Sequence, residues 1–300
     1  WYNMGLVAKS QQKFEYSLSL FNKANQIKKD DPKILNYMGL VLLKLERFEE
    51  ATKCLKNSLL LNVDAKGDVL NSISVALINQ NKHQVYADYS EAREYAQKAL
   101  EIDKDNIYAL NNLSLTFLYE YKIDQAIHTI NKAIDINPNY PSNFINLGMA
   151  YKYLNMFEQA EINFKIGYNL DKNNFDQHGP LSEVLLSQNK LFEGWFFYEF
   201  RKKRPKRINF NKPLWYPDLG YGKILLWGEQ GVGDTILFST SIKSILNKFE
   251  KIYILVEKRL VPVFEDFYPE IEVIEWNSEV DERLFDYHLS ICSLGKYFRK

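Results

Sequence analysis

The sequence is short of the features that most often identify a protein class from composition. No apolar run reaches the roughly 18 residues that a membrane-spanning helix needs, so we expect no transmembrane segment. The two cysteines, Cys54 and Cys292, lie far apart and match no metal-binding spacing, which favours packed thiols in a reducing, cytoplasmic compartment. The formal net charge is zero, so nothing global attracts the chain to nucleic acid or to an anionic membrane. No carboxylate pair has metal-ligand spacing, and we expect no bound metal.

What the chain does contain is enough apolar surface for a folded core. Hydrophobic residues make up 46% and aromatic residues 15% of its 300 residues, which is typical of folded rather than disordered protein. A chain of this length accommodates about two domains. We predict three parts: repeats over 1–203, a linker over 204–221 and an α/β segment over 222–300.

Small residues recur through the first part with a period of 34 residues. Gly5 and Gly39 are one period apart, and so are Ser114 and Gly148. A second series keeps this spacing except for seven extra residues in the third unit: Ser17, Ala51, Ala92, Ala126, Ala160 and Gly194. The pattern resembles the tetratricopeptide repeat, in which each unit is two antiparallel helices and stacked units form an α-solenoid. We expect six units. Trp1 falls on the tryptophan position of the repeat, so we expect the chain to begin inside a unit, with further units before it.

One polar series lies on the first helix of these units. Asn3, Asn71, Asn112 and Asn146 occupy the same repeat position, where Tyr37 stands in the second unit. Asparagine is a mediocre helix former, so its recurrence needs a reason. In tetratricopeptide repeats this position lines the concave groove, where side-chain amides can bind the backbone of an extended peptide. The alternative is a row of solvated side chains in an asparagine-rich sequence, and the pattern favours neither interpretation.

The last helix of the repeats, within 191–205, is aromatic on nearly every side. Such a helix is usually buried on more than one face, so we expect it to dock the repeats onto the segment that follows. Six cations follow between Arg201 and Arg207. They can bind nucleic acid or a phosphorylated ligand, but cations also suit the end of a helix that Pro205 terminates, and we favour this second interpretation.

Short apolar runs alternate with helical patterns after residue 222. We predict strands at 223–227, 251–256, 271–276 and 287–291, and helices at 235–248 and 260–267. Alternation with short links predicts a parallel sheet with helices on both faces. The fold class is therefore α plus α/β.

The first strand leads into a glycine-rich turn, GEQGVGDT, at 228–235. Glycine lets the backbone bend sharply and approach a ligand, and open α/β sheets bind ligands at this corner. Asp234 or Thr235 can also cap the next helix. Two known phosphate-binding loops fit poorly. Asp234 stands where a Walker A loop needs lysine, and Ile236 stands where the dinucleotide fingerprint has its third glycine.

The segment PLWYPDLGYGKILLWGEQGVGDTILFSTSI, preceded by EGWFFYEFR and followed by FDYHLSICSL, resembles bacterial tetratricopeptide proteins with a glycosyltransferase domain. That domain is similar to the heptosyltransferases, and the architecture is similar to that of O-linked N-acetylglucosamine transferases. The resemblance implies a GT-B fold of the inverting type, with 222–300 as the first, acceptor-side Rossmann-like half. It implies that Asp234 accepts the proton of the acceptor hydroxyl, unless this side chain only caps its helix. The acceptor-binding residues it implies are Glu229, Gln230, Gly231, Gly233 and Thr235. A nucleotide-sugar donor would bind a second half that is missing from these residues, and no other cofactor is implied.

Two functions are compatible with these features. The leading one is a glycosyltransferase that moves a sugar from a nucleotide-sugar to a protein or glycan hydroxyl, while the repeats recruit the acceptor. The alternative is a non-catalytic scaffold for protein–protein interaction, with the α/β segment as an inert docking module.

Overall fold

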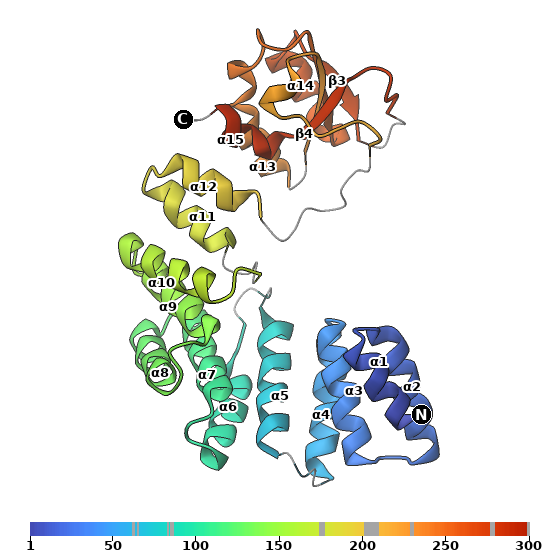
Figure 1. Cartoon of the computed structure of the whole chain (residues 1–300), viewed down its shortest axis with the longest axis vertical. Helices are drawn as coiled ribbons and strands as arrows, with labels where there is room; N and C mark the ends of the chain where they lie inside the picture. Colours follow the sequence, from blue (N-terminus) through green and yellow to red (C-terminus); the bar gives the residue numbers. More distant parts are fainter. Residues whose placement is uncertain are drawn as a thin grey trace. The chain divides into compact units, whose positions relative to one another are not determined.

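The computed structural model divides the chain into two compact units, Trp1–Lys172 and Asn173–Lys300 (Figure 1). It describes residues 1–61, 64, 66–82, 84, 87–173, 178–200, 210–228, 231–276 and 280–298. The basic run at 201–207 lies outside the described residues.

Unit 1 is a stack of antiparallel helix pairs. Its described helices are α1 (Tyr2–Ser10), α2 (Phe14–Ile27), α3 (Pro32–Lys44), α4 (Phe48–Leu60), α5 (Lys66–Asn81), α6 (Ser90–Ile102), α7 (Ile107–Tyr119), α8 (Ile123–Ile136), α9 (Pro141–Tyr153) and α10 (Phe157–Leu170). A sixth pair, α11 (His178–Ser187) and α12 (Leu191–Tyr198), belongs to unit 2. The prediction of six helix pairs is confirmed.

Small residues set the distance between the helices of a pair. A Cβ built on Gly39 of α3 would lie 2.5 Å from Leu55 Cγ of α4, and one on Gly148 of α9 would lie 2.8 Å from Phe164 of α10. Ser17 of α2 reaches back to the first helix, because its hydroxyl donates to the Gly5 carbonyl at 2.8 Å. The large side chains Leu55 and Phe164 are fully buried. The 34-residue period is therefore the repeat of one close helix crossing.

The α/β part of unit 2 holds four parallel strands in the order β3–β2–β1–β4. The strands are β1 (Lys223–Trp227), β2 (Lys251–Val256), β3 (Glu272–Glu275) and β4 (Tyr287–Ser290). The α-helices are α13 (Val232–Ser239), α14 (Val261–Phe267) and α15 (Leu294–Phe298), and short 3₁₀ turns are η2 (Pro217–Leu219), η3 (Ile242–Ser244), η4 (Lys258–Leu260) and η5 (Ile291–Ser293). The predicted parallel sheet is confirmed, but the predicted helix at 235–248 is wrong in its second half.

The expectation of helices on both faces of the sheet is also wrong for the described residues. Ile224 and Leu226 of β1 pack in one cluster with side chains of α13, α14 and α15. Leu225 and Trp227 point to the opposite face, where the described side chains that cover them come from irregular segments around Phe210 and 280–285. The strand order explains this. The chain moves in one direction from β1 to β2 to β3, and right-handed crossovers then place α13 and α14 on one face.

The last repeat helix is part of the α/β core. Trp195 of α12 is 6% exposed and lies in the same cluster as the β1 side chains, with Phe238 of α13 at 5.9 Å between ring centroids. Gly295 of α15 leaves the space that the Trp195 indole fills. The expectation that this aromatic helix docks onto the following segment is confirmed.

Candidate functional site

The first helices of successive repeats form a continuous row in unit 1. Within unit 1, α2 contacts α3, α4 contacts α5, α6 contacts α7 and α8 contacts α9, and direct contacts also join α3 to α5, α5 to α7 and α7 to α9. In a curved stack, the row of helices that contact one another lies on the inner side. Three members of the predicted asparagine series, Asn71, Asn112 and Asn146, lie on these helices, and Asn3 lies on α1.

The structure links two of the four asparagines directly and places the other two apart. Asn112 Nδ2 on α7 donates to Asn71 Oδ1 on α5 at 2.5 Å. Asn146 Nδ2 on α9 donates to Ser114 Oγ on α7 at 3.4 Å. Asn112 and Asn146 are only 7% and 6% exposed, whereas Asn3 on α1 is exposed and lines a surface hollow. The central members therefore join adjacent repeats, which sequence reasoning did not anticipate.

A second amide pair lies beside the first. Asn111 Nδ2 donates to Asn143 Oδ1 at 3.3 Å across the α7–α9 interface. Asn143 is fully buried, and its own Nδ2 has no hydrogen-bond partner among the described residues. The amides on α5, α7 and α9 thus form a local polar cluster, in which three successive repeats contact one another through primary amides.

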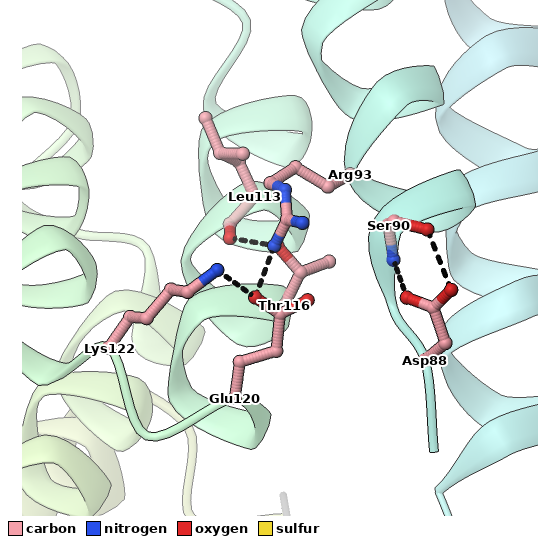
Figure 2. Close-up of polar contacts among 7 residues, drawn as sticks. All are labelled: Asp88, Ser90, Arg93, Leu113, Thr116, Glu120 and Lys122. Atoms are coloured by element: carbon pink, nitrogen blue, oxygen red, sulfur yellow. Dashed lines mark hydrogen bonds and ion pairs between the residues drawn. The ribbon is translucent and has the colours of Figure 1, made fainter. Parts of the chain in front are cut away.

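A charged joint that the sequence analysis missed holds the third and fourth repeats together (Figure 2). Glu120, which follows α7, pairs with Arg93 of α6 and with Lys122 Nζ at 2.6 Å. The Arg93 guanidinium also lies over the Phe117 ring at 5.7 Å. Burial opposes ionisation of Glu120, but the hydrogen bonds from Lys122 and Arg93 outweigh it and lower its pKa below the ordinary 4.5.

The signal for this joint was available in the repeat register. Arg93 and Glu120 are 27 residues apart, and the same two positions hold Leu18 and Leu45 in an earlier pair of repeats and Ile127 and Leu154 in the next one. An ion pair therefore stands where two other repeat pairs have aliphatic side chains and where the pair directly before it has Thr52 and Asn79. Nearby, Asp88 accepts hydrogen bonds from the Ser90 main-chain N–H at 2.8 Å and hydroxyl at 2.9 Å at the start of α6 (Figure 2).

The glycine turn joins β1 to α13 in unit 2. A Cβ on Gly228 would lie 2.8 Å from Thr235 Oγ1, so this glycine permits the close approach of strand and helix. Thr235 is 4% exposed, and its hydroxyl donates to the Gly231 carbonyl at 3.1 Å. Thr235 therefore stabilises the conformation of the glycine turn.

Asp234 is half-buried at the first turn of α13. The Gly231 main-chain N–H donates to its Oδ2 at 3.4 Å, which is the capping geometry that the sequence offered as one alternative. A Cβ on Gly233 would meet nothing within 4 Å, so the fold does not demand glycine there. Glu229 and Gln230 lie outside the described residues.

Strand β4 of the same sheet holds a buried histidine. Trp227 Nε1–H donates to His288 Nδ1 at 3.1 Å, and burial lowers the pKa of His288 below its ordinary 6.5. Two main-chain hydrogen bonds attach the linker to β4. The His288 N–H donates to the Pro213 carbonyl, and the Trp215 N–H donates to the His288 carbonyl. His288 therefore has a structural role, because it binds the linker to the sheet.

The described residues contain no group of three or more histidines, cysteines or carboxylates placed to hold a metal ion. Among the described helices, none combines the length and the hydropathy needed to cross a bilayer. Neither Cys54 nor Cys292 is part of a disulfide.

Comparison with known proteins assigns the repeats. Residues 107–140 match the family model of the tetratricopeptide repeat. Protein FlbA of Caulobacter vibrioides is 22% identical in an alignment that covers 100% of this chain and 49% of FlbA. The mitochondrial tetratricopeptide repeat protein 19 homolog of Drosophila melanogaster is 33% identical over 41% of this chain and 37% of its own length. The chain thus spans about half of FlbA and less of the second relative.

Solved structures agree on the fold. A thermophilic tetratricopeptide protein of Thermus thermophilus has a TM-score of 0.50 at 18% identity, with 56% of this chain and 89% of that chain covered. The APC/C hetero-tetramer Cut9–Hcn1 has a TM-score of 0.57 at 15% identity, covering 67% and 38%. The chain carries a tetratricopeptide solenoid followed by a small parallel α/β region. None of the four proteins named here has a description that refers to sugar transfer, so these comparisons do not support the glycosyltransferase resemblance.

Proposed function

We propose that the repeats form a protein-binding scaffold that holds an extended segment of a partner protein along the row of first helices in unit 1. The observation that carries this proposal is the row itself. Helices α3, α5, α7 and α9 contact one another on one side of the stack, and polar amides gather on their shared face. Tetratricopeptide arrays use their inner face as an extended binding surface. The two cysteines form no disulfide, which fits a reducing compartment, and we place this scaffold in the cytoplasm.

The amides can supply main-chain recognition. A primary amide has two donors and an acceptor oxygen, and the Asn112–Asn71 bond uses only one of the donors on Asn112. The remaining capacity suits the alternating N–H and C=O groups of an extended peptide. Asn71 is the more accessible member, because it is half-buried whereas Asn112 is 7% exposed. We expect a ligand to contact the Asn71 side chain first and to reach only the small exposed part of the Asn112 side chain.

Selection of peptides from a random 12-residue display library on this chain tests the proposal. We expect selected peptides to bind in calorimetry, and Asn71→Ala with Asn112→Ala to weaken binding at least tenfold. Asn57→Ala, at an exposed position of α4, is the matched control and should change nothing. Equal binding by the double variant and the control would remove the asparagine row from recognition.

A second candidate is sugar transfer with Asp234 as the general base, and one observation favours it. The Asp234 carboxylate is half-exposed just beyond the carboxyl end of β1, the edge at which open α/β sheets bind ligands. In this proposal Gly231 and Gly233 let an acceptor approach the backbone, while Thr235 supports the turn. Glu229 and Gln230 would add hydrogen bonds to the acceptor. The hydrogen bond from Gly231 is compatible with capping and catalysis by the same carboxylate.

Incubation of a longer protein that includes the implied donor-binding half with a panel of nucleotide-sugars tests this second candidate. Any sugar release should fall by orders of magnitude in Asp234→Asn and persist in Asp266→Asn, which alters an exposed carboxylate on α14. If no donor gives thermal stabilisation or turnover, sugar transfer is refuted and the α/β region is only a docking module of the scaffold.

A further inference from the structure

The first helices of the fourth and fifth repeats carry almost no charge. Helix α7 has no charged residue among its 13, and α9 has only Lys152, in its last turn. Charged residues make up 25% of the chain, so a helix of 13 residues with average composition would carry about three. The second helices that pack against α7 are different, because α6 and α8 hold Glu91, Arg93, Glu94, Lys98, Glu101, Asp124, Lys132 and Asp135. Charge is therefore concentrated on the second helices of these repeats.

Part of the uncharged area is accessible and lies on the row of first helices. Three residues of α7 are three, four or seven positions from Asn112, which places them on the same side of the helix: Tyr108, Leu115 and Tyr119. The matching positions of α9, one period later, are Ser142, Met149 and Tyr153. We call these six residues the neutral surface. Tyr108 is 54% exposed and the other five are half-buried, so a ligand can contact all of them.

Tyrosines at the two ends of α7 are held in place by other rings. Tyr108 contacts Tyr140 edge to face at 5.5 Å between ring centroids, and Tyr119 stacks on Tyr89 at 5.1 Å. Rings that are already positioned lose little conformational freedom when a ligand packs on them. Each ring also carries a hydroxyl that can donate or accept a hydrogen bond. The neutral surface thus offers apolar contact and uncharged hydrogen-bonding groups.

The charged groups that follow Tyr119 in the chain already have partners. Glu120 pairs with Arg93 and with Lys122. Lys152 lies at the carboxyl end of α9, where a cation suits the helix dipole. A charged ligand group that faces the neutral surface would lose hydration without gaining an opposite charge, and this disfavours its binding.

We propose that the neutral surface binds an uncharged, internal segment of the partner protein, with amide, hydroxyl or aromatic side chains facing α7 and α9. The proposal rests on the peptide-binding function proposed above and adds the chemical class of the ligand. Charge complementarity carries it, because an uncharged surface selects uncharged side chains. The segment is internal because a chain terminus would bring a carboxylate or an ammonium group to a surface that lacks a counter-charge.

Selection on the full chain from a 12-residue library of all residue types tests the proposal, with both peptide ends fused to a carrier. At several positions of the selected peptides, we expect aspartate, glutamate, lysine and arginine together to be at least threefold rarer than in the input. A selected peptide is then synthesised with its carboxyl end free or amidated. The two forms should bind with affinities within twofold of each other.

A charge placed on the neutral surface gives a readout that a folding defect does not imitate. Tyr108→Lys changes the most exposed of the six residues, and selection on this variant should enrich aspartate or glutamate at least threefold at one peptide position. Asn131→Lys adds the same charge at an exposed position of the second helix α8. This matched control should select the same peptides as the native protein.

The outcomes separate this inference from the function on which it rests. Peptides that carry charged residues at the input frequency, yet lose binding in Asn71→Ala with Asn112→Ala, would overturn the inference and leave peptide binding intact. A tenfold preference for a free carboxyl end would also overturn it, and so would selection of the native peptides on Tyr108→Lys. If no peptide is selected at all, both the inference and the peptide-binding function are refuted.

Discussion

Removing the charge of Glu120 gives the sharpest test of how the repeats are held together. The change Glu120→Gln keeps the shape of the side chain and takes away the carboxylate that Arg93 and Lys122 share. Arg93 then remains 19% exposed beside the Phe117 ring, without this carboxylate to balance its charge. We expect the stack to lose stability at the α6–α7 interface.

The magnitude follows from the exposure of the partners. Hydrogen bonds to charged groups contribute about 1.5–3 kcal/mol each when they are shielded from water. The Glu120 and Arg93 side chains are 16% and 19% exposed, so their bond keeps most of that value. The Lys122 side chain is 48% exposed, and its contribution is on the order of 0.5 kcal/mol. We expect Glu120→Gln to lower the free energy of unfolding by about 2–3 kcal/mol.

A double-mutant cycle separates the pair from its surroundings. The next pair of repeats carries Ile127 with Leu154 at the matching positions, so Arg93→Leu combined with Glu120→Leu introduces the kind of aliphatic pair that the chain already has there. Replacing a buried ion pair by apolar residues is often neutral or stabilising, whereas removal of one partner is costly. We therefore expect the double variant within about 1 kcal/mol of the native protein, and Glu120→Leu to be the worse single variant.

Urea unfolding followed by circular dichroism measures the four proteins of the cycle and Glu120→Gln. The denaturant slope should stay constant, because the same helices unfold in each case. Raising the salt to about 1 M should reduce the cost of Glu120→Gln only slightly, since a partly buried pair is poorly screened. A cost below about 0.5 kcal/mol for Glu120→Gln, or a double variant as unstable as the sum of its singles, would refute this account of the joint.

Gly295→Ala should destabilise unit 2 by about 1–3 kcal/mol, because a Cβ there meets the buried Trp195 indole; Gly233→Ala, where a Cβ meets nothing within 4 Å, is the control and should be neutral or slightly stabilising in the same thermal assay. Unit 2 should also lose stability as the pH falls from about 7.5 to about 5. Burial lowers the pKa values of His178 and His288 below 6.5, so below that pH the unfolded state binds more protons than the native state. Urea midpoints followed by tryptophan fluorescence at several pH values check this, and His288→Gln should flatten the dependence; a flat profile across that range in the native protein would contradict it.

Several elements follow from local sequence because their determinants are local. The run from Ile224 to Trp227 is apolar and short, and it forms β1. Gly39 and Gly148 predicted the close helix crossings, because only a residue without a side chain fits against Leu55 and Phe164. Such signals depend on the residue and its near neighbours in the chain.

The errors arose where a distant group decides the outcome. The helix predicted at 235–248 ends at Ser239 in the structure. The Tyr268 hydroxyl donates to the Ser239 carbonyl at 2.8 Å, so a side chain from just after α14 occupies a main-chain oxygen at the end of the helix. The apolar pattern of the helix itself contains no sign of that partner.

The candidate site divides in the same way. Repeat spacing found the asparagine series, but it did not reveal that Asn112 and Asn146 are buried between repeats and bonded to neighbouring helices. It also passed over Arg93 and Glu120, which become a pair only when α6 and α7 stack.

The sequence by itself determined the helix pairs, their period and the parallel strands, because spacing along the chain is enough to encode a repeated local contact. Only the tertiary structure decided which polar side chains face a neighbouring repeat, which face of the sheet carries helices, and that α12 packs in the α/β core. Those outcomes depend on contacts between residues far apart in the chain, and packing selects such contacts by shape and by the need to pair buried polar groups.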